Sequence, residues 1–101
     1  MSEYQQKVLQ AHEAILHDDL LQMRNMINKY AMEKGELPQS LDDLVHAGYL
    51  HEIPKDPTTD QRDWKVSIGE NRKFANGLKG VVDVHSVSTA NALDGSLYST
   101  W

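Results

Sequence analysis

Residues 3–34 read EYQQKVLQAHEAILHDDLLQMRNMINKYAMEK, without Pro or Gly and rich in strong helix formers. From Leu16 onward, apolar residues recur at steps of four, three, four and three, which places them on one face of a helix. This pattern predicts a helix over residues 3–34. Lys34 places a cation at the negative end of the helix dipole, and Gly35 is expected to cap the helix in the left-handed conformation.

The predicted helix is longer than the domain that carries it. Its 32 residues span roughly 48 Å at 1.5 Å per residue, whereas a compact domain of about 100 residues is only about 35 Å across. Polar residues dilute the apolar stripe in the N-terminal half. We therefore expect residues 1–35 to form an overhanging helix, with Leu9, Leu16 and Leu20 as candidates for packing against other chains.

Composition limits the function classes. The chain has 101 residues, enough for one domain spanning residues 1–101, and is 40% hydrophobic and 25% charged. A net charge of −5 without a basic run argues against binding to nucleic acid or to an anionic membrane surface. The absence of Cys excludes disulfides and thiolate metal sites.

The first two residues look like an added start. Ser2 is the only candidate for an N-cap before a helix that has already begun at Glu3. No apolar run long enough to cross a membrane is visible in the sequence. We interpret Met1-Ser2 as the beginning of a shortened chain.

Residues 36–63 are predicted to form a helical loop. Pro38 imposes an extended step, Ser40 and Asp43 have capping-box spacing at the start of a short second helix, and Gly48 ends that helix. The exit from this loop is stiffened by three further residues that we expect to be structural: Pro54, Asp56 and Pro57.

Residues 64–101 are predicted to form a small sheet and a C-terminal loop. Trp64, Val66 and Ile68 alternate with polar residues, as do Val82 and Val84, and this pattern is typical of strands with one buried face. The long connection between them carries an Asn76-Gly77 turn signal. Tyr98 and Trp101 near the chain end are expected to return to the sheet or helix, because aromatic side chains gain much from burial.

These elements predict an α+β fold. A long N-terminal α-helix packs on a small antiparallel β-sheet of two to four strands, and a short second helix lies in the connecting loop. A sheet this small needs the helix as its second layer.

The chain resembles the major pseudopilins of type II secretion, within the type IV pilin-like group. The order and spacing of residues between Gly35 and Pro57 carry most of the resemblance, and the C-terminal region adds to it. The matching residues are Tyr30 to Gly35, Pro38, Leu41-Asp42-Asp43-Leu44-Val45, Gly48-Tyr49-Leu50, Pro54-Lys55-Asp56-Pro57, Asp83-Val84-His85-Ser86, Asp94-Gly95 and Trp101.

The resemblance implies a structural subunit without catalysis. The native protein would begin with a cleaved leader and a hydrophobic half-helix anchored in the inner membrane, a half that is missing from this sequence. Its globular domain would be periplasmic. Subunits would self-assemble into a helical filament together with minor pseudopilins and the secretion machinery, and the filament would drive protein export.

The resemblance also raises the question of calcium. Members of the family commonly bind calcium in the C-terminal loop through carbonyls, a Ser and two Asp side chains. In this sequence an Asp is missing near Thr89 or Ala90, which leaves Ser88 and Asp94 as weak calcium candidates. Calcium prefers several charged oxygen ligands, so we expect no metal or other cofactor. Hydrogen bonds and packing of Leu93 and Leu97 would hold the loop instead.

Other chemistry-bearing residues have simpler interpretations. His12 and His17 are five residues apart on the helix and cannot share an ion. In a strand, Asp83 and His85 share a face that excludes Ser86, so no catalytic triad is expected. Neighbouring carboxylates such as Asp18-Asp19 and Asp42-Asp43 point apart on a helix. A solvated face is predicted for three further charged residues of the long helix: Arg24, Lys29 and Glu33.

The sequence therefore predicts a filament subunit, with two alternatives. One is a type IV pilin-like subunit for adhesion, motility or DNA uptake. The absence of Cys disfavours it, because such pilins often carry a disulfide-bonded C-terminal loop. The other is a stand-alone module whose exposed helix binds a partner helix.

Overall fold

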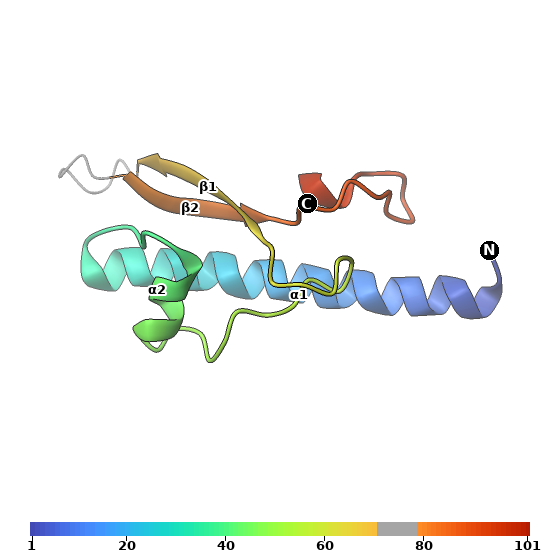
Figure 1. Ribbon diagram of the computed structural model, residues 1–101, viewed down its shortest axis with the longest axis horizontal. Helices are drawn as coiled ribbons and strands as arrows, with labels where there is room; N and C mark the ends of the chain where they lie inside the picture. Colours follow the sequence, from blue (N-terminus) through green and yellow to red (C-terminus); the bar gives the residue numbers. More distant parts are fainter. Residues whose placement is uncertain (71–78) are drawn as a thin grey trace.

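The computed structural model describes residues 1–70 and 79–101 (Figure 1). The fold is α+β, as predicted, because a long N-terminal helix packs against a two-stranded antiparallel sheet. The elements in chain order are α1 (Glu3–Lys34), α2 (Leu41–His46), β1 (Lys65–Glu70), β2 (Lys79–His85) and the 3-10 helix η1 (Tyr98–Thr100). The predicted Asn76-Gly77 turn lies outside the described residues.

Both ends of α1 are capped by local interactions. The Ser2 hydroxyl accepts a hydrogen bond from the Gln5 amide, and the Gln5 side chain accepts one from the Ser2 amide, both at 3.1 Å. This complete capping box confirms Ser2, the candidate that the sequence offered, as the N-cap. At the other end, Gly35 has φ of 70° and donates to the Ala31 carbonyl, which confirms the predicted left-handed cap.

The short helix α2 is fixed by a variant of the predicted capping box. The Ser40 hydroxyl accepts from the Asp43 amide at 3.3 Å, but the Asp43 carboxylate accepts from the Gln39 amide, not from that of Ser40. Gly48 follows the helix with φ of 84°, as its predicted role requires. These caps fix the two ends of α2, which lies over the C-terminal part of α1 (Figure 1).

The loop exit is organised around a buried carboxylate. Asp56 is fully buried, and its side chain accepts hydrogen bonds from the Thr58 amide at 2.8 Å, the Thr58 hydroxyl at 2.6 Å and the Ser86 hydroxyl at 2.5 Å. Pro57 is partly buried beside it, and the Pro54 carbonyl accepts from the Trp64 indole at 2.8 Å. These contacts join the loop to the start of β1 and to the end of β2, which lie at the same end of the sheet, and they satisfy the buried Asp56 side chain with hydrogen bonds.

The sheet contains a β-bulge that the sequence pattern did not reveal. Ser67 pairs with Asp83, but Ile68 pairs with Val81, so Val82 is an extra residue on β2. An extra residue moves the following side chains to the opposite face. The predicted inward position of Val82 is therefore wrong, because Val82 is 37% exposed and Val81 is buried instead. The predicted burial of Ile68 is also wrong: this residue keeps the face of Val66 and pairs with Val81, but it is 58% exposed.

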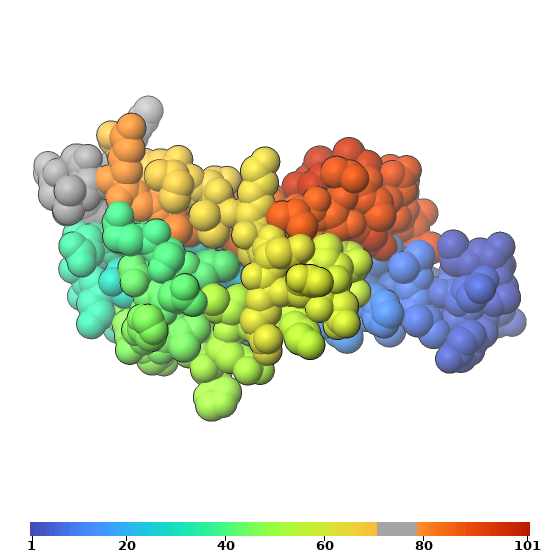
Figure 2. All heavy atoms as spheres, viewed as in Figure 1, coloured from blue at the N-terminus to red at the C-terminus, as the bar shows by residue number. Residues whose placement is uncertain are grey.

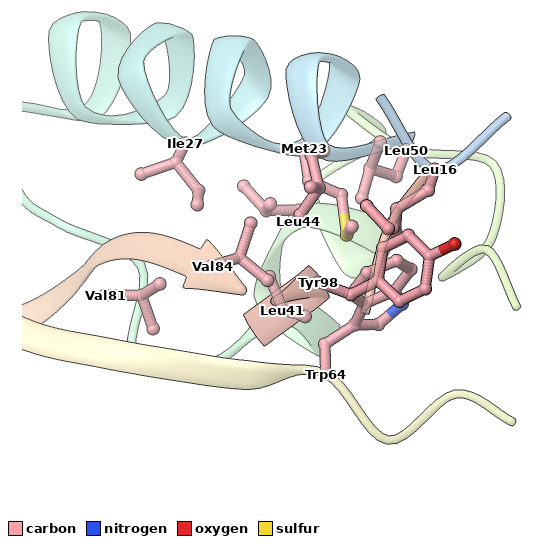
Figure 3. Packing of buried hydrophobic residues seen from close by; sticks show 12 residues of the cluster. Leu16, Met23, Ile27, Leu41, Leu44, Leu50, Trp64, Val81, Val84 and Tyr98 are labelled. Atoms are coloured by element: carbon pink, nitrogen blue, oxygen red, sulfur yellow. The ribbon is translucent and has the colours of Figure 1, made fainter. Parts of the chain in front are cut away.

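The core lies between α1, α2, the sheet and η1 (Figure 3). It includes the predicted stripe of α1 from Leu16 to Ile27, and Tyr30 packs against it. Its buried members are Leu16, Leu20, Met23, Ile27, Leu41, Leu44, Leu50, Trp64, Val81, Val84, Ala92 and Tyr98. The predicted return of the chain end is confirmed, because Tyr98 is buried and Trp101 packs against the core.

Candidate interaction surface on the N-terminal half of α1

The N-terminal part of α1 projects beyond the rest of the chain. The molecule measures 52 × 25 × 17 Å, and the long dimension follows α1 (Figure 1). Leu16 is the first buried residue of the helix. Figure 2 shows the N-terminal end of the helix standing clear of the other elements. We call residues 3–15 the overhang.

The part of α1 that is available for contact with other molecules is shorter than the sequence suggested. Leu16 and Leu20 are 0% and 1% exposed, because they pack against the core of their own chain. Neither side chain is available for contact with another molecule. Of the three predicted assembly residues, Leu9 alone keeps an accessible surface, and it is partly buried.

Apolar side chains nevertheless line the overhang. Tyr4, Val8, Ala11 and Ile15 follow at steps of four, three and four, which gives a second stripe on the helix. Tyr4 is 77% exposed and Ile15 is 48% exposed. A shallow hollow of about 400 Å³ runs beside this stripe, and its walls are formed by Met1, Tyr4, Gln5, Val8, Leu9 and His12.

The overhang is almost electrically neutral although the chain carries a net charge of −5. Glu3 and Lys7 form an exposed ion pair at 3.8 Å with i, i+4 spacing. Glu13 is the remaining acid, and its carboxylate is directed at the C-terminal loop of the same chain. Apolar contact with another molecule would therefore meet little charge repulsion at this surface.

A polar stripe next to the core stripe holds the C-terminal segment on α1. The Glu13 carboxylate accepts hydrogen bonds from the Leu93 amide and from the Tyr98 hydroxyl, both at 2.8 Å. One turn further along, the His17 ring stacks on Trp101, with ring centroids 4.1 Å apart. Burial, followed by the neighbouring Glu13 carboxylate, raises the pKa of Tyr98 to about 12.

Arg24 completes this stripe. Its guanidinium donates to the Asp83 carboxylate at 2.8 Å, the Val84 carbonyl at 2.9 Å and the Trp101 carbonyl at 2.6 Å. The predicted solvated face therefore holds only for Lys29 and Glu33, which are exposed. Arg24 instead links the helix, the sheet and the chain end.

The pKa of Asp83 reflects its pairing with Arg24. Partial burial alone would raise the pKa of Asp83. Hydrogen bonds from the Val84 amide and the Arg24 guanidinium outweigh burial, and the pKa of Asp83 is lowered. Asp83 is therefore ionised wherever Arg24 is paired with it.

The calcium candidates of the C-terminal loop bind neighbouring groups. The Asp94 carboxylate accepts from the Ser96 hydroxyl at 2.6 Å and the Ser96 amide at 2.9 Å, and these bonds lower the pKa of Asp94. The Ser88 hydroxyl accepts from the Ala90 amide at 3.3 Å. Over residues 1–70 and 79–101, no three side chains of His, Cys, Asp or Glu come together in a way that could hold a metal ion.

The loop is held by hydrogen bonds, as expected, but not by its leucines. The Ala92 amide donates to the Ser96 carbonyl at 2.6 Å, and the Tyr98 amide donates to the Ala90 carbonyl at 3.1 Å. Leu93 and Leu97 are 37% and 40% exposed, so their predicted packing role is wrong. The buried apolar residues of the loop region are Ala92 and Tyr98 instead.

The residues that had suggested a hydrolytic triad are not assembled as one. Asp83 and His85 share a face, with 3.3 Å between the Asp83 carboxylate and His85 Nε2. Ser86 turns the other way and donates to Asp56. This arrangement agrees with the strand argument, because the hydroxyl and the imidazole lie on opposite faces.

Sequence reasoning missed the roles of Glu13, Arg24 and Ser86. Glu13, His17 and Arg24 are spaced four and seven residues apart, which places them on one helical face. That spacing was the available signal, although it does not identify their partners. Their partners lie up to 85 residues away in the sequence.

Comparisons with known proteins leave the chain unassigned. No helix of the described residues is both long and apolar enough to cross a membrane. No protein-family model, no curated protein and no solved structure matches the chain.

Proposed function

We propose that the protein is a structural subunit of a pilin-like filament, namely a major pseudopilin of the periplasmic pseudopilus that drives export by type II secretion. The observation that supports this proposal is the overhang: residues 3–15 form a helix that its own chain does not bury, with apolar and nearly neutral sides. A lone helix of this length is marginal in water, so it gains most from packing against other molecules.

In this proposal, two parts of the chain have different roles. The overhang supplies contact between subunits, and the globular part sets their spacing along the filament. Contacts between different surfaces of identical subunits propagate without closing, which gives a helical filament. Glu13, near the C-terminal end of the overhang, and His17 and Arg24 beyond it bind the C-terminal segment of the chain to α1.

The proposal includes the cellular setting implied by the resemblance. Before assembly, a hydrophobic segment preceding α1 would anchor each subunit in the inner membrane, with the globular domain in the periplasm. Minor pseudopilins and other secretion components would be its partners, and the subunit would have no catalysis of its own. A related filament for adhesion, motility or DNA uptake is the nearest variant of this proposal.

One observation favours a second candidate, a stand-alone module that binds a partner helix. The apolar stripe of the overhang, on which Tyr4 and Ile15 are exposed, would fit a partner helix as well as another subunit. The coding sequence before Glu3 separates the candidates. About 20 consecutive apolar residues there would support the filament, and a natural start at Met1 would support the module.

Cross-linking in the cells that make the protein tests the filament directly. The chain contains no Cys, so one introduced thiol reports one position. We expect Val8→Cys, on the overhang, to give covalent dimers in high yield with a short bifunctional thiol reagent, because one thiol per chain can join two chains. Lys29→Cys, on the exposed face of the covered half, is the matched control and should give much less dimer.

A strain that lacks the protein tests its biological role. Loss of the protein should abolish secretion by the type II pathway, and the wild-type chain should restore it. A normal secretome without the protein would contradict the pseudopilus. A monomeric Val8→Cys protein with a fully reactive thiol would contradict any filament built through the overhang.

A further inference from the structure

The two outer edges of the sheet differ. The edge of β2 is covered by side chains and by the preceding loop. The Val84 carbonyl accepts from Arg24 at 2.9 Å, the Val81 amide donates to the Pro38 carbonyl at 2.8 Å, and the Lys79 carbonyl accepts from the Gln39 side chain at 2.8 Å. Such cover protects an edge from pairing with another strand.

The edge of β1 has no comparable cover among the described residues. Lys65–Glu70 pairs with β2 on one side, and no backbone hydrogen bond from any described residue reaches its other side. Ile68, near its middle, is 58% exposed, although Val66 on the same face packs against the core. An open edge with an exposed β-branched residue is a template for another strand.

We propose that β1 pairs with β1 of a second copy of this chain, antiparallel and around a two-fold axis, to give a continuous four-stranded sheet. In an antiparallel pair, the backbone N–H and C=O groups of two opposed residues point either both toward the other strand or both away from it. This direction alternates along a strand, so opposed residues of two copies of the same strand differ by an even number of positions. The axis must therefore pass through a residue, which is either Ser67 or Ile68.

Side-chain chemistry selects Ser67. With the axis at Ser67, Val66 of each copy lies opposite Ile68 of the other, and the exposed isoleucines are covered by apolar neighbours. With the axis at Ile68, Val66 would lie opposite the charged Glu70. The Ser67 register also places Lys65 opposite Gly69, where no side chain competes for space.

Charge supports a second copy in this orientation. β1 carries one cation at its start, Lys65, and one anion at its end, Glu70. Antiparallel pairing keeps the two lysines at opposite ends of the contact, and the two glutamates likewise, whereas parallel in-register pairing would place like charges side by side. The contact is therefore locally balanced although each chain has a net charge of −5.

The absence of Cys allows a sharp test on the purified full chain. Opposed residues of an antiparallel pair have Cα atoms about 4.5–5.5 Å apart, which lies within the range that a disulfide spans. Under mild oxidation, Ser67→Cys should form a disulfide-linked dimer at least tenfold faster than Lys55→Cys, an exposed control in the loop. Ile68→Cys reports the alternative register.

Sedimentation equilibrium tests the same contact without a cross-link. The wild-type chain should show a concentration-dependent mass approaching twice its 11.5 kDa, and Ile68→Lys should weaken this association at least tenfold. Because Ile68 is exposed in the single chain, the variant should still melt in one cooperative transition, which shows that it is folded.

Three outcomes would overturn the proposal. They are a monomer at all soluble concentrations, a Ser67→Cys chain that is oxidised no faster than Lys55→Cys, and faster linkage through Ile68→Cys than through Ser67→Cys. The proposed filament does not depend on this contact, because it uses the overhang. Efficient cross-linking through Val8→Cys with no contact through β1 would retain the filament and reject only the sheet pairing.

Discussion

At the scale of single residues, Arg24 connects parts of the chain that are far apart in sequence. Its partners Asp83 and Trp101 lie 59 and 77 residues away. A helix pattern shows which residues share a face, but it carries no information about partners at that distance. This is why the sequence predicted a solvated Arg24 and why the polar stripe could not be recognised in advance.

Replacing Arg24 should destabilise the protein. Arg24→Ala removes hydrogen bonds to two carbonyls and a carboxylate, and it leaves the partly buried Asp83 without its cation. We expect the free energy of unfolding to fall by about 2–3 kcal/mol, as measured by urea denaturation. Lys29→Ala, which alters an exposed residue, should change it by less than about 0.5 kcal/mol. Equal losses in the two variants would contradict the role assigned to Arg24.

Tyr98 should make stability decrease in alkali. An unfolded tyrosine ionises near pH 10, whereas the raised pKa of Tyr98 keeps its proton on until about 12. Between these values unfolding releases a proton, so stability falls as pH rises. Tyr98→Phe should therefore flatten the dependence of urea midpoint on pH above 10. Some slope should remain, because burial also raises the pKa of Tyr30 and Tyr49. An unchanged slope would contradict the assignment.

At the scale of elements, the helices and their caps were predictable because their signals are local. The periodicity of α1, the left-handed Gly35 and the Ser40 cap of α2 all depend on residues within one or two turns. The sheet was predicted less well. Its bulge at Val82 depends on which residue of β1 lies opposite, and alternation along one strand does not contain that information.

The cap of α1 gives a prediction at this scale. Gly35 has φ of 70°, and an added Cβ would meet no atom within 4 Å, so only the backbone conformation resists a side chain. Gly35→Val should lower the free energy of unfolding by about 1–2 kcal/mol, visible as a lower melting temperature. Gly35→Asn should cost less, because Asn tolerates this conformation better. Equal melting temperatures for wild type and Gly35→Val would remove the cap from the account.

Shortening the overhang should separate folding from association. A chain that begins at Ala11 keeps Glu13 and every buried residue of α1. We expect its free energy of unfolding to stay within about 1 kcal/mol of the full chain, because the deleted residues bury little surface. It should not enter cross-linked multimers in cells. Loss of the cooperative melting transition would show that residues 1–10 belong to the folding core.

At the scale of the whole molecule, the comparison of helix length with domain size was the most informative part of the sequence. It predicted a projecting helix, and the structure has one. It did not predict where the core begins: Leu16 and Leu20 were expected in the assembly surface and are buried. The C-terminal segment covers that part of α1, and its position depends on Glu13, His17 and Arg24, which the sequence could not connect to their partners.

Hydrogen–deuterium exchange with mass spectrometry, on the isolated chain and on the assembled protein, tests the central claim most directly. In the isolated chain, the amides of residues 3–15 should exchange much faster than those of residues 16–31, because none of these residues belongs to the core and their tertiary hydrogen bonds are made by Glu13, near the end of the stretch. In the assembled protein, the overhang should become as protected as the core half. Slow exchange of residues 3–15 in the isolated chain, or no gain of protection on assembly, would contradict the account.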